Sequence, residues 1–334
     1  MRPIGEQVVV ITGASSGIGR EAALQFALRG ASLVLVARNA DALREVEREV
    51  HRLGTQAQTV VADVARWEEV ERVAAQAVAR FGRIDTWVNN AAVTEYAAVE
   101  DMTPDEIARI VQVDLLGTIY GMKAALPHLT RQGQGTIVNV ASVEARRAMP
   151  LQSAYAAAKH GLAGFSDALR LELAHAGLPI AVTLILPSSI NTPLYAHARS
   201  KLGLLPRPIP PVYEPRTAAR AIVFAAEHPR REIVVGGAGK LALVLQRISP
   251  ALLDWLLLRN GMAWRMQESS APGNQQGILF APPSGFGSVT GDFGGRSKSV
   301  SLYTRYVGEY PGRQVALAGV ALLGLLVLLR RVGS

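Results

Sequence analysis

The alternation of short apolar runs with longer helical patterns constrains this chain most. Seven runs rich in β-branched residues lie at positions 7–12, 32–37, 56–62, 85–90, 135–141, 180–186 and 232–236. Amphipathic stretches such as DALREVEREVHRL separate them. Strands that are apolar throughout and alternate with helices are typical of a parallel sheet covered on both faces. The sequence therefore predicts an α/β fold, a doubly wound parallel sheet, as a single catalytic domain over residues 1–236.

The chain changes character after the predicted sheet. Residues 237–267 are apolar and predicted to be helical, with Pro250 interrupting the helix. Residues 268–312 are rich in Gly, Ser, Pro and Gln, so we expect a flexible linker there. Residues 313–334 contain an uncharged apolar run, 315–329, that is closed by Arg330 and Arg331.

This terminal apolar run is a candidate membrane anchor. As a helix it would extend about 22 Å, against a hydrocarbon core of about 30 Å, and the two arginines could reach the interface. A buried helix or a subunit contact is the alternative. The N-terminus shows no signal-peptide pattern. We therefore expect a cytoplasmic protein that associates with a membrane through its C-terminus.

Composition excludes several kinds of site. The absence of cysteine rules out disulfides, thiolate metal sites and a cysteine nucleophile. The six histidines show no metal-ligand spacing, so we predict no metal. The net charge of +8 would suit nucleic acid, but the basic residues are spread along the chain. We predict no nucleic-acid partner, because an anionic cofactor would use the charge as well.

The segment TGASSGIG at positions 12–19 directly follows the first predicted strand. Glycines there let the backbone turn sharply and let a pyrophosphate approach main-chain N–H groups at the start of a helix. An ordinary glycine-rich turn is the alternative, but the placement after the opening strand favours a dinucleotide. The predicted cofactor-binding residues of this turn are Gly13, Ser15, Ser16, Gly17, Ile18 and Gly19.

The second predicted strand ends at Arg38 and carries no carboxylate. An NAD site usually has an acidic residue there, which binds the ribose 2′-hydroxyl. A guanidinium can instead bind a 2′-phosphate with two hydrogen bonds. The sequence therefore favours NADP(H) as the cofactor, with a solvated surface arginine as the alternative.

The motif YAAAK places Tyr155 and Lys159 one turn apart on a helix predicted over residues 152–175. Ser142 ends a predicted strand, at the edge of the sheet where ligands bind. A phenol with a pKa near 10 is a poor acid or base at neutral pH, and a neighbouring ammonium lowers that pKa. A hydroxyl can hold the substrate oxygen. These three residues are the predicted catalytic group, although a tyrosine and lysine at this spacing are usually only surface neighbours.

With TGASSGIG, the pair Asp63-Val64, NNAA at positions 89–92, the serine of NVAS and YAAAK, the chain resembles the short-chain dehydrogenase/reductase superfamily. The resemblance covers roughly residues 5–236 and implies a Rossmann fold and a homo-oligomer. It implies that Tyr155 donates or accepts the proton, that Ser142 stabilises the substrate oxygen and that Lys159 binds the nicotinamide ribose. The further cofactor contacts that it implies are Asp63, Val64, Asn89, Ala91, Pro187 and Thr192.

Three positions depart from the family pattern. Ala92 and Ser188 each replace a glycine. Asp114, which the resemblance adds to the predicted catalytic residues, stands where the family has asparagine. An aspartate adds a negative charge near Lys159, which would partly cancel the effect of the lysine on Tyr155. Our hypothesis is a raised tyrosine pKa that favours carbonyl reduction, with a neutral substitution as the alternative.

The segment 192–217 is the expected substrate loop. Leucine and tyrosine side chains there predict an apolar wall and a hydrophobic ketone or aldehyde as substrate: Leu194, Tyr195, Leu202, Leu204 and Leu205. The sequence thus predicts an NADP(H)-dependent oxidoreductase that acts on a small-molecule carbonyl or alcohol. The alternatives are a catalytically impaired dinucleotide-binding sensor or scaffold, and an NAD-dependent alcohol dehydrogenase.

Overall fold

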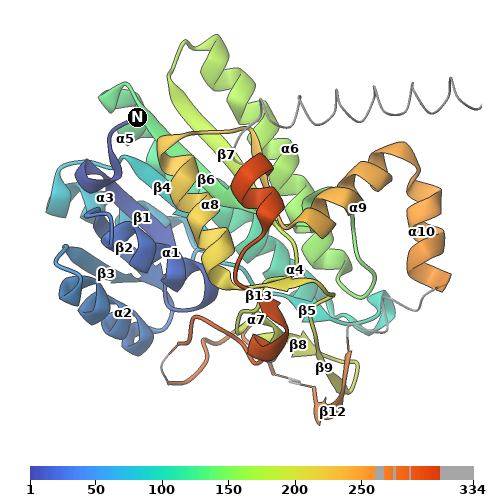
Figure 1. Ribbon diagram of the computed structural model, residues 1–334. Helices are drawn as coiled ribbons and strands as arrows, with labels where there is room; N and C mark the ends of the chain where they lie inside the picture. The colour runs from blue at the N-terminus through green and yellow to red at the C-terminus, as the bar shows by residue number, and fades with distance from the viewer. Residues whose placement is uncertain (260–266, 274–275, 286, 309–334) are drawn as a thin grey trace, which may run out of the picture.

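A seven-stranded parallel sheet forms the centre of the computed structural model, which describes residues 1–259, 267–273, 276–285 and 287–308 (Figure 1). Its strand order is β11-β7-β6-β4-β1-β2-β3, and each strand lies within one residue of a predicted run. The strands are β1 (Val8–Thr12), β2 (Ser32–Ala37), β3 (Ala57–Val61), β4 (Thr86–Asn89), β6 (Gly135–Val140), β7 (Ile180–Pro187) and β11 (Glu232–Val235). The predicted doubly wound sheet is confirmed.

Helices cover both faces of this sheet, and each layer has its own apolar core. Figure 1 shows α8 beside α1 on one face. That face carries α1 (Gly17–Ala27), α2 (Ala40–Arg52) and α8 (Pro215–Glu227). The other face carries α3 (Trp67–Phe81), α4 (Pro104–Val111), α5 (Gly117–Gln132) and α6 (Ser153–His175). Because the strands are buried on both sides, their sequences are apolar throughout rather than alternating.

Three two-stranded sheets join the loops after β4 and β7 to one another and to the C-terminal segment. In parallel pairs, β5 (Glu95–Tyr96) meets β8 (Arg199–Ser200), and β10 (Val212–Tyr213) meets β13 (Ser297–Lys298). In an antiparallel pair, β9 (Leu204–Pro206) meets β12 (Gln267–Pro272). The short helix α7 (Leu194–His197) lies between β7 and β8. Chain segments that are distant in sequence therefore enclose the carboxyl end of the sheet.

A helical hairpin follows β11. It consists of α9 (Gly237–Ile248) and α10 (Pro250–Arg259), and it breaks at Ser249, where Pro250 was expected to interrupt a longer helix. Leu243, Leu253 and Leu257 are buried on its inner side. Leu241, Ile248, Leu252, Trp255 and Leu258 are exposed on its outer side. The hairpin thus packs against the domain through only one of two apolar faces.

The described part of the predicted linker 268–312 differs from a free tether, because it lies on the sheet domain. Leu279 is fully buried and belongs to the main apolar core. The Thr304 hydroxyl accepts a hydrogen bond of 2.9 Å from the Gly236 N–H. The composition is poor in large apolar residues, yet a few buried side chains and backbone hydrogen bonds suffice to fix its course.

The predicted membrane anchor, residues 313–334, lies outside the described residues. Within the described part of the chain, no helix combines the length and the apolar character that a membrane crossing requires.

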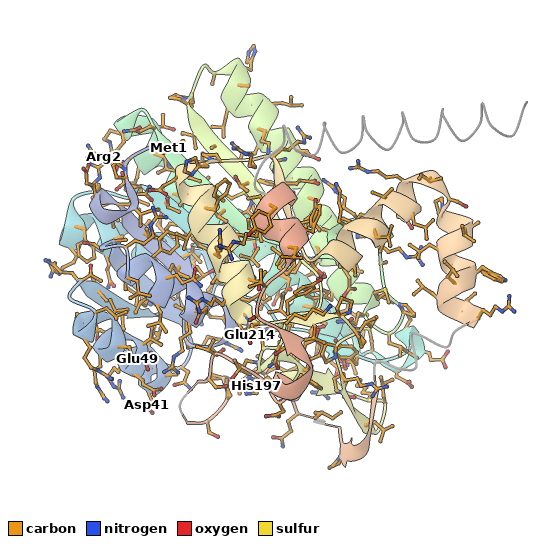
Figure 2. The ribbon with its side chains drawn as sticks, viewed as in Figure 1. Met1, Arg2, Asp41, Glu49, His197 and Glu214 are labelled. Carbon is orange, nitrogen blue, oxygen red and sulfur yellow. The ribbon has the colours of Figure 1, made fainter. Side chains whose placement is uncertain are left out.

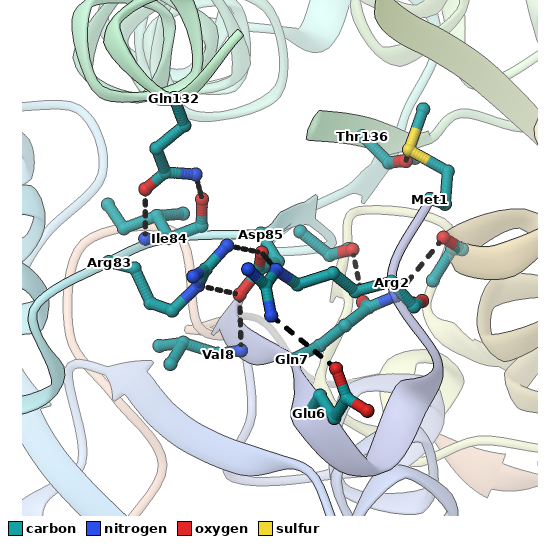
Figure 3. A network of polar contacts seen from close by, with 12 residues as sticks. Met1, Arg2, Glu6, Gln7, Val8, Arg83, Ile84, Asp85, Gln132 and Thr136 are labelled. Atoms are coloured by element: carbon teal, nitrogen blue, oxygen red, sulfur yellow. Dashed lines mark hydrogen bonds and ion pairs between the residues drawn. The ribbon is translucent and has the colours of Figure 1, made fainter. Parts of the chain in front are cut away.

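Asp85 connects the amino ends of β1 and β4 (Figure 3). Its buried carboxylate accepts a hydrogen bond of 2.9 Å from the Val8 N–H. Arg83 donates to both oxygens, at 2.8 Å from Nε and 2.6 Å from Nη2. The neighbouring Gln132 closes the same edge, because its side chain binds the N–H and carbonyl of Ile84. This network fixes how the first strand enters the sheet.

We expect Asp85→Ala to lower the free energy of unfolding by about 2 kcal/mol, because it leaves the Val8 N–H and the Arg83 guanidinium without their acceptor. Glu71→Ala, at an exposed position of α3, should change it by less than about 0.5 kcal/mol. Urea denaturation followed by circular dichroism measures both values. Equal effects of the two substitutions would show that the Asp85 network does not stabilise the fold.

Candidate active site

The turn between β1 and α1 requires its glycines. Gly13 and Gly17 have positive φ angles of 67° and 54°, which favour glycine. A Cβ atom on Gly13 would lie 2.8 Å from the Ala91 Cα, and one on Gly19 would lie 2.2 Å from the Gly13 carbonyl oxygen. The backbone therefore packs tightly behind the turn. Its N–H groups at the start of α1 form an anion-binding position.

A cavity of about 560 Å³ extends from this turn along the carboxyl ends of the strands. The structure brings most of the predicted site residues to its wall. The predicted residues that line it are Gly13, Ser15, Ser16, Gly17, Ile18, Arg38, Asp63, Val64, Ala91, Ser142, Tyr155, Lys159, Pro187 and Thr192. Gly19, Asn89 and Asp114 lie behind the wall.

Asn89, the last residue of β4, is buried and binds side chains of its own strand and of the neighbouring β6. It accepts from Trp87 Nε1 at 2.8 Å and donates to Asn139 Oδ1 at 2.9 Å. The next residue, Asn90, lines the cavity and donates to the carbonyls of Thr12 at 3.0 Å and Gly13 at 3.2 Å. Asn90 thus supports the glycine turn, a role that the sequence analysis missed.

Ser142, Tyr155 and Lys159 converge in the same cavity. Tyr155 and Lys159 face it from successive turns of α6, and the Lys159 Nζ lies 5.2 Å from the centre of the Tyr155 ring. Ser142 follows β6, and its hydroxyl accepts a hydrogen bond of 3.1 Å from the Glu144 N–H. The site therefore combines a phenol, an ammonium group and a hydroxyl.

Asp114 forms a fully buried ion pair with Lys159, with 3.2 Å between Oδ2 and Nζ. The other oxygen of Asp114 accepts a hydrogen bond of 2.8 Å from the Val93 N–H. Asp114 lies in a single π-helical turn, Gln112–Leu116, between α4 and α5, an irregularity common at functional sites. Burial raises the pKa of Asp114, whereas the Lys159 charge and the Val93 N–H oppose that change.

The pKa of the Tyr155 phenol lies well above its ordinary value. Burial is the largest cause, followed by the negative charges of Glu144 and Asp114, while the hydrogen bond with Ser142 acts in the opposite direction. The direction is the one that we expected from the charge of Asp114, although burial and Glu144 contribute more to the rise in the pKa of Tyr155. The phenol is therefore held in its protonated form.

Glu144 is a buried acid that the sequence analysis missed. It lines the cavity with only 7% of its surface exposed. A backbone hydrogen bond from Met149 reaches the carboxyl group, but Oε2 has no hydrogen-bond partner among the described residues. Burial raises the pKa of Glu144 to about 8. Its position just after β6, where ligands bind in such sheets, was the available signal.

The substrate end of the cavity is apolar, but its wall differs from the predicted one. Leu194 and Tyr195 line it, whereas Leu202, Leu204 and Leu205 do not, since this stretch reaches β9 and pairs with β12. The helical hairpin supplies much of the wall instead. The apolar residues from the hairpin and from the loop between β9 and β10 are Ile209, Pro210, Pro211, Ala238, Ala242, Leu253, Leu256 and Leu257.

Arg38 lies at the opposite end of the cavity, and the C-terminal segment holds its guanidinium. It donates to the carbonyls of Ile278 at 2.6 Å and Leu279 at 3.2 Å. Arg109 donates to the same Leu279 carbonyl at 2.8 Å and to Asp63 at 2.6 Å. Both arginines are therefore already bound to protein acceptors.

Comparisons with known proteins agree with this geometry. The sequence matches the short chain dehydrogenase family over residues 7–203. The uncharacterized oxidoreductase YxnA of Bacillus subtilis is 38% identical, over 91% of this chain and 86% of its own length. Dehydrogenase/reductase SDR family member 7B of Bos taurus is 34% identical, over 79% of this chain and 84% of its own length.

A solved structure shows the same fold. The alcohol dehydrogenase of the archaeon Thermococcus sibiricus, complexed with 5-hydroxy-NADP, aligns with a TM-score of 0.60 and 26% identity. The alignment covers 68% of this chain and 95% of that chain. Since the family match includes both the glycine turn and the helix that carries Tyr155 and Lys159, the chain belongs to the short chain dehydrogenase family of oxidoreductases, which bind a nicotinamide dinucleotide.

Proposed function

We propose that the protein is an NADP(H)-dependent oxidoreductase that interconverts a hydrophobic ketone or aldehyde and its alcohol. The observation that carries the proposal is the cavity that the glycine turn shares with Ser142, Tyr155 and Lys159. An anion-binding turn and a proton-transfer group at opposite ends of one cavity suit a dinucleotide with its reactive ring beside the substrate.

The residues at the cofactor end fit such a dinucleotide. A Cβ atom on Gly13 or Gly19 would collide with backbone, so these glycines are needed for a close turn. The guanidinium of Arg38 lies in the cavity, where it suits a 2′-phosphate. We further propose that Lys159 binds the nicotinamide ribose and that Thr192 binds the carboxamide. When bound, the cofactor supplies or accepts the hydride.

The proton side of the reaction follows from the chain's own residues. The substrate oxygen accepts hydrogen bonds from the hydroxyls of Ser142 and Tyr155. During reduction, the carbonyl carbon gains the hydride and the oxygen gains the Tyr155 proton, which leaves a phenolate beside Lys159. Burial and nearby negative charge raise the pKa of Tyr155, so the free protein holds the acid needed for reduction.

The lining of the substrate end favours a mostly apolar substrate that carries few polar groups. Leucines of the helical hairpin and prolines of the loop after β9 surround the substrate end. Glu144 adds one carboxyl group, and burial raises its pKa to about 8, so it is mostly neutral at pH 7. A neutral acid can donate a hydrogen bond without adding charge to an apolar chamber.

We expect Tyr155→Phe to lower carbonyl reduction about 10²- to 10⁴-fold, because it removes the proton donor. The measurement is NADPH oxidation over a panel of apolar ketones and aldehydes, with NADPH affinity measured in parallel. Tyr120→Phe is the matched control, because Tyr120 lies outside the cavity. Its ring packs on that of Trp67, with 5.9 Å between the ring centres. Nucleotide binding without turnover in the wild type would favour a sensor or scaffold.

Arg38→Ala should weaken NADPH binding about 10- to 100-fold, because it removes a charge-assisted contact with the 2′-phosphate. NADH lacks that phosphate, so its affinity should change little. Arg44→Ala, on the exposed face of α2, serves as the control for net charge. Fluorescence titrations with both nucleotides measure the effect. Equal weakening of both would contradict a preference for NADP(H) and favour the NAD-dependent alternative.

The pH dependence of alcohol oxidation should report the acids around Tyr155. Oxidation needs the deprotonated phenol, and negative charge at Asp114 and Glu144 raises the pKa of Tyr155. Asp114→Asn should therefore move the alkaline rise in rate to lower pH. Glu144→Gln should raise the oxidation rate relative to wild type only at pH values above about 8. Below that pH the wild-type carboxyl group of Glu144 is already neutral, so its removal changes no charge. Profiles that superimpose on the wild type would contradict this electrostatic account.

A further inference from the structure

A segment of the C-terminal chain crosses the cofactor end of the cavity. We call residues 276–285 and 287–293 the strap; in Figure 1 it is the orange chain that follows β12. Near one end, the Ile278 N–H donates to the carbonyl of His197, which Figure 2 labels, at 3.0 Å. At the other end, the Phe293 N–H donates to Asn191 Oδ1 at 3.1 Å. The strap is therefore anchored on both sides of the site.

Between these anchors, carbonyls of the strap bind the donors of the phosphate-binding end. The Gly17 N–H, at the start of α1, donates to the Ser288 carbonyl at 2.9 Å. The Arg38 guanidinium donates to the Ile278 carbonyl at 2.6 Å. Gly17 begins the helix whose free N–H groups suit a pyrophosphate, and the proposed function gives Arg38 to the 2′-phosphate. A neutral backbone carbonyl thus takes each place where an anion would bind.

Side chains next to the turn extend this contact. Arg20 on α1 donates to the Gly287 carbonyl and also pairs with Glu49 of α2, labelled in Figure 2, at 2.9 Å. Asn39 donates to the carbonyls of Pro283 at 2.8 Å and Gly285 at 2.9 Å. The strap is therefore held by α1 and by the turn that begins α2.

Glycines of the strap allow this close approach. A Cβ atom on Gly287 would lie 2.0 Å from the Ser15 carbonyl oxygen, and one on Gly291 would lie 2.5 Å from the Thr192 carbonyl oxygen. Both neighbours are backbone atoms, which cannot move aside as a flexible side chain can. By contrast, a Cβ atom on Gly295, just beyond the strap, would meet no described atom within 4 Å. The position of the strap on the site therefore requires glycine at 287 and 291 but not at 295.

We propose that the strap is an intramolecular ligand of the dinucleotide site, which the cofactor must displace from Gly17 and Arg38 in order to bind. Hydrogen bonds from these donors to a charged phosphate are stronger than those to a neutral carbonyl. The cofactor can therefore displace the strap carbonyls from both donors. The loss of the strap contacts opposes binding and lowers the apparent affinity. This inference rests on the proposed function for the identity of the competing nucleotide.

The test uses the full chain with Gly287→Ala, which prevents the strap from seating on Ser15, and Gly295→Ala as the matched control. Fluorescence titration and stopped-flow mixing with NADPH measure affinity and association rate. We expect Gly287→Ala to tighten binding about five- to tenfold and to speed association, while Gly295→Ala behaves like the wild type. Gly291→Ala, a second unseating variant, should change both in the same direction as Gly287→Ala.

Hydrogen–deuterium exchange gives a readout that is independent of turnover. Amides of the strap should exchange faster in wild-type protein when NADPH is added, and faster in Gly287→Ala without it. Weaker NADPH binding in both Gly287→Ala and Gly291→Ala would overturn the proposal, because it would show that the strap contributes contacts to the bound nucleotide. Unchanged binding with retained carbonyl turnover would also overturn it while leaving the proposed function intact. Tighter binding without turnover would support the strap and refute the enzyme assignment.

Discussion

The buried ion pair between Asp114 and Lys159 is the interaction on which the rest of the site depends. Two opposite charges 3.2 Å apart, both shielded from water, are strongly coupled, and removal of either partner leaves an uncompensated buried charge. The Val93 N–H ties the same carboxylate to the loop after β4. The pair therefore fixes α6 against the helices around the π-helical turn, and with α6 it fixes the position of Tyr155.

The parts of the molecule that the sequence could predict are those set by local periodicity. The strands and α6 follow from apolar runs and from i, i+4 spacing, which need no knowledge of the rest of the chain. The choice between Asn89 and Asn90 was not available in this way, because one residue of strand register decides which side chain enters the cavity. Glu144 was missed for a similar reason, since its raised pKa comes from tertiary burial.

The C-terminal segments show a second limit of sequence reasoning. Glycine-rich composition predicts flexibility, but glycine also permits contacts that no side chain would allow. Gly287 and Gly291 are of the second kind, and only the position of Ser15 and Thr192 in space reveals it. The helical hairpin is a related case: its apolar sequence predicted a helix, but not that Leu253 and Leu257 would line the substrate end.

The contact between Arg20 and Gly287 spans 267 residues of sequence, which has a consequence for how the molecule is made. The cost of closing a loop grows with its length, and domains form as the chain leaves the ribosome. The phosphate-binding turn precedes the strap in the chain by more than two hundred residues, and the last strand of the sheet, β11, also precedes it. A nascent molecule thus presents an open nucleotide site first, and it acquires the competing segment only later in synthesis.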